Sequence, residues 1–204
     1  MEKSFETVVF DLGGVLIDWN PNYVFEPMFG NQEELDHFFG KVCTPDWNEL
    51  QDAGRSLSEA TEEKVREFPA FETAIRAYYG RWTEMIGGAF IGTVEILETL
   101  IGMGDFQILA LTNWSHETWP YALDNFEFLS WFDGIMVSGQ EKMKKPDPAF
   151  YQLLTDRYEL TKEKTLFIDD NVRNIESARE FGFHSIHFTS PYALEDELRT
   201  LGVL

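Results

Sequence analysis

The chain has 204 residues, of which 44% are apolar and 15% aromatic, a composition that supports a sizeable core and excludes a disordered chain. Its formal net charge of −20 argues against binding nucleic acid through the phosphate backbone, which requires clustered lysine and arginine. The apolar runs are too short for a membrane span, and no signal-peptide pattern opens the sequence. The single cysteine, Cys43, cannot form an internal disulfide. We therefore expect a cytoplasmic protein that binds neither nucleic acid nor membranes.

Five apolar runs, many of them β-branched, are predicted to be strands: residues 7–10, 108–111, 134–138, 165–168 and 184–188. Their apolar character is nearly continuous rather than alternating, which favours strands buried on both faces of a parallel sheet. Helical patterns lie between them, over residues 148–157 and in a segment that ends at Gly182. Strands that alternate with helices predict a Rossmann-like, doubly wound α/β fold.

Residues 19–88 interrupt this alternation, because they contain no convincing strand and several helical patterns. Ser56 and Glu59 have the spacing of a capping box at a helix start, and an apolar stripe runs through residues 71–85. Since this insertion follows the first strand, we expect it above the carboxyl edge of the sheet, where a lid would sit. The predicted division is a helical cap over 19–88 and a core domain made of residues 1–18 and 89–204.

Polar residues follow the apolar runs at four places: Asp11, Thr112 with Asn113, Lys145, and Asp169 with Asp170. Each place alone is typical of a turn or a helix cap. Ligands of an open parallel sheet, however, bind in the crevice beyond the carboxyl ends of its strands. We therefore predict that the four places converge on one phosphoryl-transfer site.

The residue types indicate how such a site would be built. Asp11 precedes the flexible Gly13-Gly14 loop, so its carboxylate is placed to attack phosphorus as a nucleophile. Mg²⁺ prefers oxygen ligands in octahedral geometry. The predicted metal ligands are the carboxylates of Asp11, Asp169 and Asp170 and the backbone carbonyl of Gly13.

Three further residues are predicted to contact the phosphate. Thr112 and Asn113 end the second strand of the core, where their polar groups can hold the equatorial phosphate oxygens. Lys145 adds a compact positive charge for both the phosphate and the Asp11 carboxylate. The predicted catalytic residues are therefore Asp11, Thr112 and Lys145.

The order of these segments, DLGGVLID, LTN, KKP and FIDDN, resembles that of the haloacid dehalogenase superfamily of hydrolases, including a helical cap after the first strand. The chain is also similar to a subgroup of small sugar-phosphate phosphatases that resemble bacterial α-D-glucose-1-phosphate phosphatase. The resemblance implies catalysis with Mg²⁺ and an aspartyl-phosphate. It also implies Asp170 as a direct metal ligand, Asp169 as a ligand either directly or through water, and Asn174 as a polar residue behind the ligands.

The same resemblance separates neighbouring residues and reactions. The lysine that directly precedes proline matches the family pattern, which favours Lys145 over Lys144; Lys142 and Lys144 are expected to be solvated surface charges. Dehalogenases of this fold need no metal, carry Ser and Asn-type residues in place of the Asp169-Asp170 pair, and have Tyr in place of Gly13. A dehalogenase-type hydrolase is therefore less favoured than a phosphatase.

Gly13 departs from the phosphatase pattern, since most family members carry there a second Asp that protonates the leaving group. Loss of such a group typically costs about 10²- to 10⁴-fold in rate. One explanation is a leaving group that departs with little protonation, such as an anomeric sugar oxygen. Another is that Asp18 or a cap residue supplies the proton. A third is that the chain is a weak or silent enzyme that senses a phosphorylated ligand.

The remaining conspicuous residues have an ordinary structural interpretation. Trp19, Trp47 and Trp114 could stack on a sugar, but aromatic residues at helical spacing are usually core. The four histidines lack the spacing of metal ligands. We therefore expect a Mg²⁺-dependent phosphatase of a small phosphorylated metabolite, most simply a sugar phosphate. The runner-up is a phosphatase for another phosphoryl donor, such as a nucleotide, an acyl phosphate or a phosphorylated cofactor, and the rival from another class is a silent phospho-ligand sensor.

Overall fold

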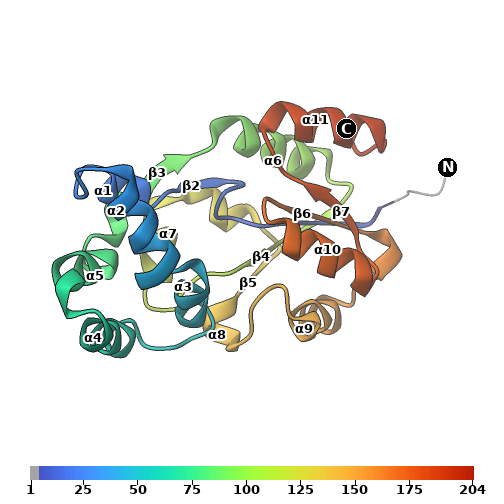
Figure 1. Ribbon diagram of the computed structural model, residues 1–204. Helices are drawn as coiled ribbons and strands as arrows, with labels where there is room; N and C mark the ends of the chain where they lie inside the picture. Colours follow the sequence, from blue (N-terminus) through green and yellow to red (C-terminus); the bar gives the residue numbers. More distant parts are fainter. Residues whose placement is uncertain (1–4) are drawn as a thin grey trace.

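The computed structural model describes residues 5–204 and contains a five-stranded parallel sheet flanked by helices, with a mainly helical lobe at one end (Figure 1). The sheet has the strand order β5-β4-β1-β6-β7. Its strands are β1 (Thr7–Phe10), β4 (Gln107–Thr112), β5 (Gly134–Val137), β6 (Thr165–Asp169) and β7 (His184–His187). All five predicted strands are confirmed to within one residue at each end, and so is the doubly wound α/β fold.

The strand order determines where a ligand can bind. From the central β1 the chain moves to β4 and β5 on one side, and it later returns through β6 to β7 on the other side. The strand order therefore reverses between β1 and β6, which are direct neighbours. This position is the topological switch point of the sheet. A crevice opens beyond the carboxyl ends of strands at such a switch point. It lies next to the residues that follow β1 and β6.

Helices cover both faces of the sheet, and β1 alternates between the two cores. Val8 and Phe10 belong to a core shared with α6 (Ile91–Met103), α7 (Trp119–Asn125) and α11 (Pro191–Thr200). Val9 belongs to a second core, shared with α9 (Pro148–Tyr158) and α10 (Val172–Phe181). Successive strand residues point to opposite faces, so a strand buried on both sides reads as continuously apolar.

The mainly helical lobe is framed by two short strands, β2 (Ile17–Trp19) and β3 (Ile86–Ala89), which pair antiparallel. Between them lie a π-helical turn (Phe38–Val42), two 3₁₀ turns (Pro69–Phe71 and Trp82–Met85), and the helices α1 (Asn22–Phe25), α2 (Gln32–His37), α3 (Pro45–Asp52), α4 (Leu57–Glu67) and α5 (Glu72–Gly80). The expectation that residues 19–88 contain no strand is wrong at both ends. Strands of three and four residues, one of them carrying Gly87-Gly88, give little β signal. The assignment of 19–88 to a separate domain stays a prediction.

Aromatic side chains fill the interior of this lobe. Trp47 is buried and meets the ring of Tyr78 edge to face at a centroid distance of 5.2 Å, as expected of a core residue.

The helix predicted at Ser56 is α4, and the Ser56 hydroxyl accepts a 3.4 Å hydrogen bond from the Glu59 backbone N–H. A short helix α8 (Ser138–Glu141) joins β5 to the loop before α9. Within residues 5–204, no helix is long and apolar enough to cross a membrane.

Candidate active site

Three carboxylates meet at the switch point of the sheet. Asp11 directly follows β1, Asp169 is the last residue of β6, and Asp170 comes next. One oxygen atom from each can be chosen so that all three lie within 4.8 Å of one another. Asp11 and Asp169 are buried, whereas Asp170 is exposed. The structure thus brings together the three acids that the sequence predicts as metal ligands.

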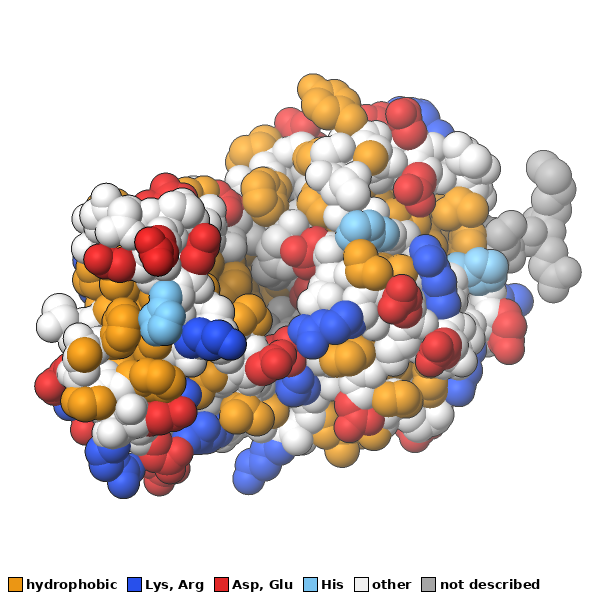
Figure 2. Space-filling model, in the orientation of Figure 1, with side chains coloured by type: hydrophobic (Ala, Val, Ile, Leu, Met, Phe, Trp, Pro, Cys, Tyr) orange, Lys and Arg blue, Asp and Glu red, His pale blue; other side chains and the backbone are white. Residues whose placement is uncertain are grey.

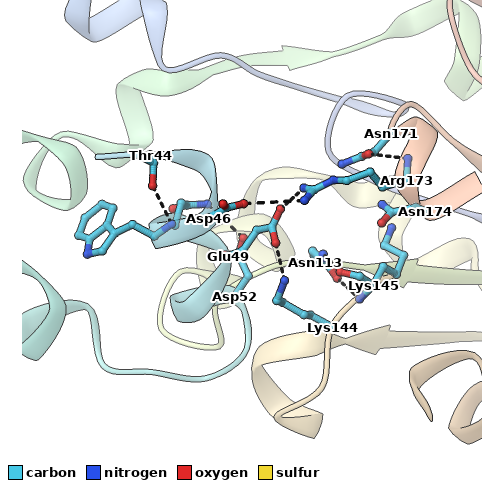
Figure 3. Close-up of polar contacts among 12 residues, drawn as sticks. Thr44, Asp46, Glu49, Asp52, Asn113, Lys144, Lys145, Asn171, Arg173 and Asn174 are labelled. Carbon is cyan, nitrogen blue, oxygen red and sulfur yellow. Dashed lines mark hydrogen bonds and ion pairs between the residues drawn. The ribbon is translucent and has the colours of Figure 1, made fainter. Parts of the chain in front are cut away.

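Lys145 provides the positive charge at the centre of this cluster. Its side chain is 1% exposed, and its Nζ lies 2.9 Å from Asp11 Oδ1 and 2.7 Å from Asp169 Oδ2. Asn113 holds the lysine backbone from both sides, since its Oδ1 accepts from Lys145 N at 2.8 Å and its Nδ2 donates to Lys145 O at 2.9 Å (Figure 3). The buried lysine is therefore positioned by Asn113, a residue predicted only to bind phosphate.

The neighbouring lysine points to another part of the molecule. Lys144 forms an ion pair with Glu49 of α3, so its predicted role as a solvated surface charge is wrong (Figure 3). The physical reason is that α3 packs against this loop and brings an acidic side chain to it, a contact between residues 95 positions apart.

Asp169 is saturated by hydrogen-bond donors. Its Oδ2 accepts from Lys145, its Oδ1 accepts from the Asn171 backbone N–H at 2.8 Å, and Asn174 Nδ2 lies 3.0 Å from both oxygens. A fully buried carboxylate needs such partners, because burial without them is costly. The arrangement makes Asp169 a fixed anchor for Lys145, and Asn174 lies behind it as the resemblance implies.

Asp170 is held differently. Its backbone carbonyl lies 2.9 Å from His187 Nε2, and its carboxylate lies against the backbone of Gly14. A Cβ atom on Gly14 would come within 2.2 Å of Asp170 Oδ2, and Gly14 has a φ of +78°. Glycine at position 14 thus permits both the turn and the close approach of the carboxylate. The Asp170 side chain faces the cleft with its oxygens available to a ligand.

The electrostatics of the cluster favour a cation. Burial raises the pKa of Asp11 well above its ordinary value; Lys145 opposes this rise, and Asp169 and Asp170 add to it. Burial and the Asp169 charge likewise raise the pKa of Asp170. Burial lowers the pKa of Lys145, but the two carboxylates it contacts outweigh that effect and raise it. Three acids share one ammonium group, an imbalance that a hard dication would relieve.

A cleft of about 260 Å³ opens over the cluster, between the sheet and the helical lobe (Figure 2). Its floor includes Asp11, Gly13 and Asp170, and its far wall includes Asn48, Glu49, Asp52, Tyr79 and Trp82. Sequence reasoning missed these far-wall residues. They lie in ordinary amphipathic helices and turns, and the carboxylates of Glu49 and Asp52 sit three residues apart with no motif to mark them.

The other predicted residues fall in or near the cleft. Thr112 is fully buried, and its hydroxyl finds no hydrogen-bond partner within residues 5–204. A Cβ atom on Gly13 would have no atom within 4 Å, so glycine is not required there by crowding. Trp19 and Trp114 line the cleft, whereas Trp47 lies in the core.

Comparison with known proteins agrees with this geometry. Residues 5–182 match the family model of the haloacid dehalogenase-like hydrolases. The chain is 25% identical to a sesquiterpene phosphatase of Aspergillus oryzae over 201 residues, covering 98% of each protein. It is 26% identical to a phosphorylated carbohydrates phosphatase of Thermotoga maritima, covering 89% of this chain and 84% of that one.

Solved structures share the fold. A magnesium complex of a HAD family enzyme from Bacteroides thetaiotaomicron superimposes with a TM-score of 0.71 at 18% identity, covering 92% of this chain and 95% of that one. The parallel sheet, the acidic cluster at its switch point and the family match over most of the chain agree. The chain belongs to the haloacid dehalogenase-like hydrolases.

Proposed function

We propose that this hydrolase is a Mg²⁺-dependent phosphomonoesterase that acts on a small phosphorylated metabolite through an aspartyl-phosphate on Asp11. The observation that carries the proposal is the contact of the buried Lys145 ammonium with both Asp11 and Asp169, beside the Asp170 carboxylate that lines the cleft. An anionic substrate needs positive charge close to the nucleophile, and Lys145 supplies it directly beneath the floor of the cleft, in contact with Asp11.

The donor set fits Mg²⁺. Asp11, Asp170 and the carbonyl of Gly13 would hold the ion, with Asp169 reached through water because its own oxygens already accept several hydrogen bonds. When bound, Mg²⁺ neutralises the carboxylates and the phosphate and favours charge build-up on the transferred group. The fold neighbour from Bacteroides thetaiotaomicron, solved as a magnesium complex, supports the choice of metal.

The phosphate itself finds partners in the residues predicted from the sequence. The unpartnered hydroxyl of Thr112 is a buried donor that a phosphate oxygen would satisfy. The Lys145 ammonium and the backbone N–H of Asn113, whose side chain already holds Lys145, would complete the phosphate site. With the phosphate held, a carboxylate oxygen of Asp11 bonds to phosphorus as the ester P–O bond breaks. Water then attacks phosphorus, the Asp11–phosphate bond breaks, and inorganic phosphate leaves.

A sugar phosphate is our first substrate candidate, as in the sugar-1-phosphate phosphatase subgroup that the motifs resemble. The carbohydrate phosphatase relative and the indoles of Trp19, Trp82 and Trp114 around the cleft support it, because sugar rings stack on aromatic faces. The same indoles, together with the sesquiterpene phosphatase relative, support a terpenyl phosphate as a second candidate.

The buried free thiol of Cys43 agrees with a cytoplasmic site of action.

The test is phosphate release from a panel that includes α-D-glucose-1-phosphate, a primary-alcohol sugar phosphate and a terpenyl phosphate, with Mg²⁺ or with EDTA. We expect turnover that requires Mg²⁺ and that falls at least about 10³-fold in Asp11→Asn. Asp36→Asn, an exposed aspartate on α2, is the matched control and keeps full activity. A folded, Mg²⁺-binding chain that hydrolyses no compound would instead favour the silent-sensor alternative.

A further inference from the structure

The cleft contains more carboxylates than the nucleophile and the metal require. Four acids line it: Asp11, Asp170, Glu49 and Asp52. Asp11 and Asp170 belong to the cluster in the floor. Glu49 forms ion pairs with both Lys144 and Arg173, which hold it as a charged acceptor. Asp52 has no ion pair with any residue from 5 to 204, so of the two carboxyls outside the floor it is the one left to exchange a proton.

Asp18, which the sequence offers as a replacement acid, is engaged elsewhere. Its Oδ2 accepts a 2.6 Å hydrogen bond from the hydroxyl of Tyr23, and the carboxylate packs against Gly87 of the paired strand β3. Its neighbour Trp19 lines the cleft, whereas Asp18 does not. The Asp18 explanation is therefore disfavoured.

We propose that Asp52 is the general acid and base of this enzyme, and that the helical lobe thus supplies the proton transfer that Gly13 cannot. The inference rests on the proposed phosphatase function and names its missing catalytic residue. Asp11 in the floor and Asp52 in the far wall line the same cleft of about 260 Å³, so the leaving group of a phosphate ester held at Asp11 would extend toward Asp52. Asp52 is the carboxyl on that wall that forms no ion pair within residues 5–204.

Asp52 is fixed in place from both sides of the cleft. Its backbone carbonyl accepts from the hydroxyl of Ser138, and that hydroxyl accepts a 2.9 Å hydrogen bond from Trp114 N, in the loop that follows β4. Its Oδ2 accepts from Asn48 Nδ2 at 3.1 Å, and Asn48 Oδ1 in turn accepts from the Tyr79 hydroxyl at 3.0 Å. The backbone carbonyl of Asp52 is thus anchored, through Ser138, to the loop that follows Thr112 and includes Asn113, the predicted phosphate contacts.

The surroundings of Asp52 suit a group that both gives and takes a proton. Burial raises its pKa to about 7, and the Glu49 carboxylate adds to the rise; Lys144 and the Ser115 backbone N–H oppose it. The other titratable groups that face it are Tyr78 and Tyr79 of α5, whose own pKa values burial raises, so that both stay neutral. A group with a pKa near the working pH is the most effective proton-transfer catalyst.

The two steps balance with Asp52 in this role. In the first, an Asp11 oxygen bonds to phosphorus, the ester P–O bond breaks, and the Asp52 proton passes to the departing oxygen, which leaves as an alcohol. In the second, water bonds to phosphorus, its proton passes to the Asp52 carboxylate, and the Asp11–phosphate bond breaks. Each turnover consumes one water and returns both aspartates to their starting states.

The test compares two substrates with different leaving groups, a primary alkyl phosphate and p-nitrophenyl phosphate, whose aryl oxide departs without a proton. For Asp52→Asn we expect kcat/KM to fall about 10²- to 10⁴-fold on the alkyl phosphate and less than about tenfold on the aryl phosphate. The loss of native alkyl-phosphate activity above about pH 7 should also disappear in the variant. Asp36→Asn should leave both substrates unaffected.

A second variant provides a rescue. Because the space beside Gly13 is open, Gly13→Asp in the Asp52→Asn background should recover at least about tenfold of the lost alkyl-phosphate activity. Equal losses on both substrates, or none on either, would overturn the role of Asp52 while leaving the phosphatase standing. If the native chain releases phosphate from neither substrate, the proposed function itself fails and this inference fails with it.

Discussion

The two walls of the cleft are built in different ways. The floor rests on strand ends and on the loop before α9, where Asp169 and Lys145 are almost completely buried and every carboxylate oxygen of Asp169 has a donor. The far wall includes one face of α3, which is held across the cleft by ion pairs of Glu49 with Lys144 and Arg173, the latter 52% exposed (Figure 3). A buried, saturated network is rigid, whereas exposed ion pairs contribute little free energy. The difference suggests that the floor fixes the phosphate chemistry and the far wall sets the leaving group.

The largest effect should come from Lys145→Met in the floor. Its removal leaves Asp11 and Asp169 as buried charges without a cation, which should lower the free energy of unfolding by about 3–5 kcal/mol and phosphate release by roughly 10³-fold. The pKa of Asp11 is raised in the fold, so the native state binds its proton more tightly than the unfolded state. Loss of the ammonium raises that pKa further, and the variant should regain stability as the pH falls.

Urea unfolding across the pH range measures this effect, and Lys144→Met is the matched control. Lys144 is 26% exposed and pairs only with the far wall, so its substitution should cost less than about 1 kcal/mol. Equal losses for the two lysines would mean that floor and far wall contribute alike, and the contrast between them would be lost.

Asn174→Ala should have the next largest effect. It removes the amide that donates to both oxygens of Asp169, which should cost about 1–3 kcal/mol of stability. Activity should fall about 10- to 100-fold because Asp169 then positions Lys145 less well. Asn125→Ala on the exposed end of α7 is the control and should change stability by less than about 0.5 kcal/mol. An Asn174 variant as active as the native chain would show that Asp169 needs no support.

The difference between the floor and the far wall also explains which residues of the site could be predicted from the sequence. The floor residues directly follow buried strands, so an apolar run that ends in Asp or Thr is enough to place them at the carboxyl edge of the sheet. Glu49 and Asp52 carry no such mark, because α3 reads as an ordinary polar helix and its contacts depend on how the lobe docks. The strands β2 and β3 escape prediction for a related reason, since each is stabilised mainly by pairing with the other.

Gly13 and Gly14, which follow Asp11 in the floor, differ in the space available beside them and therefore in the effect expected of a substitution. Gly14→Ala forces a side chain into left-handed backbone and toward Asp170, which should cost about 1–2 kcal/mol and weaken Mg²⁺ binding about 10-fold or more. Gly13→Ala enters open space and should leave both properties unchanged. Calorimetric Mg²⁺ titration with thermal unfolding checks both. Tight Mg²⁺ binding by the Gly14 variant would remove Asp170 from the ligand set.

Glu49→Gln in the far wall should have the smallest effect. It breaks the ion pairs with Lys144 and Arg173 while keeping the side chain's size, so stability should change by less than about 1 kcal/mol. We expect KM to rise about two- to fivefold with little change in kcat, and the difference from the native chain to shrink in high salt. Glu84→Gln, which breaks only the local pair with Arg81, is the control for steady-state kinetics. A fall in kcat/KM as large as that expected for Asp52→Asn would instead give Glu49 a part in the chemistry. Loosening the far wall alone changes how well the substrate is held and not how its bond is broken.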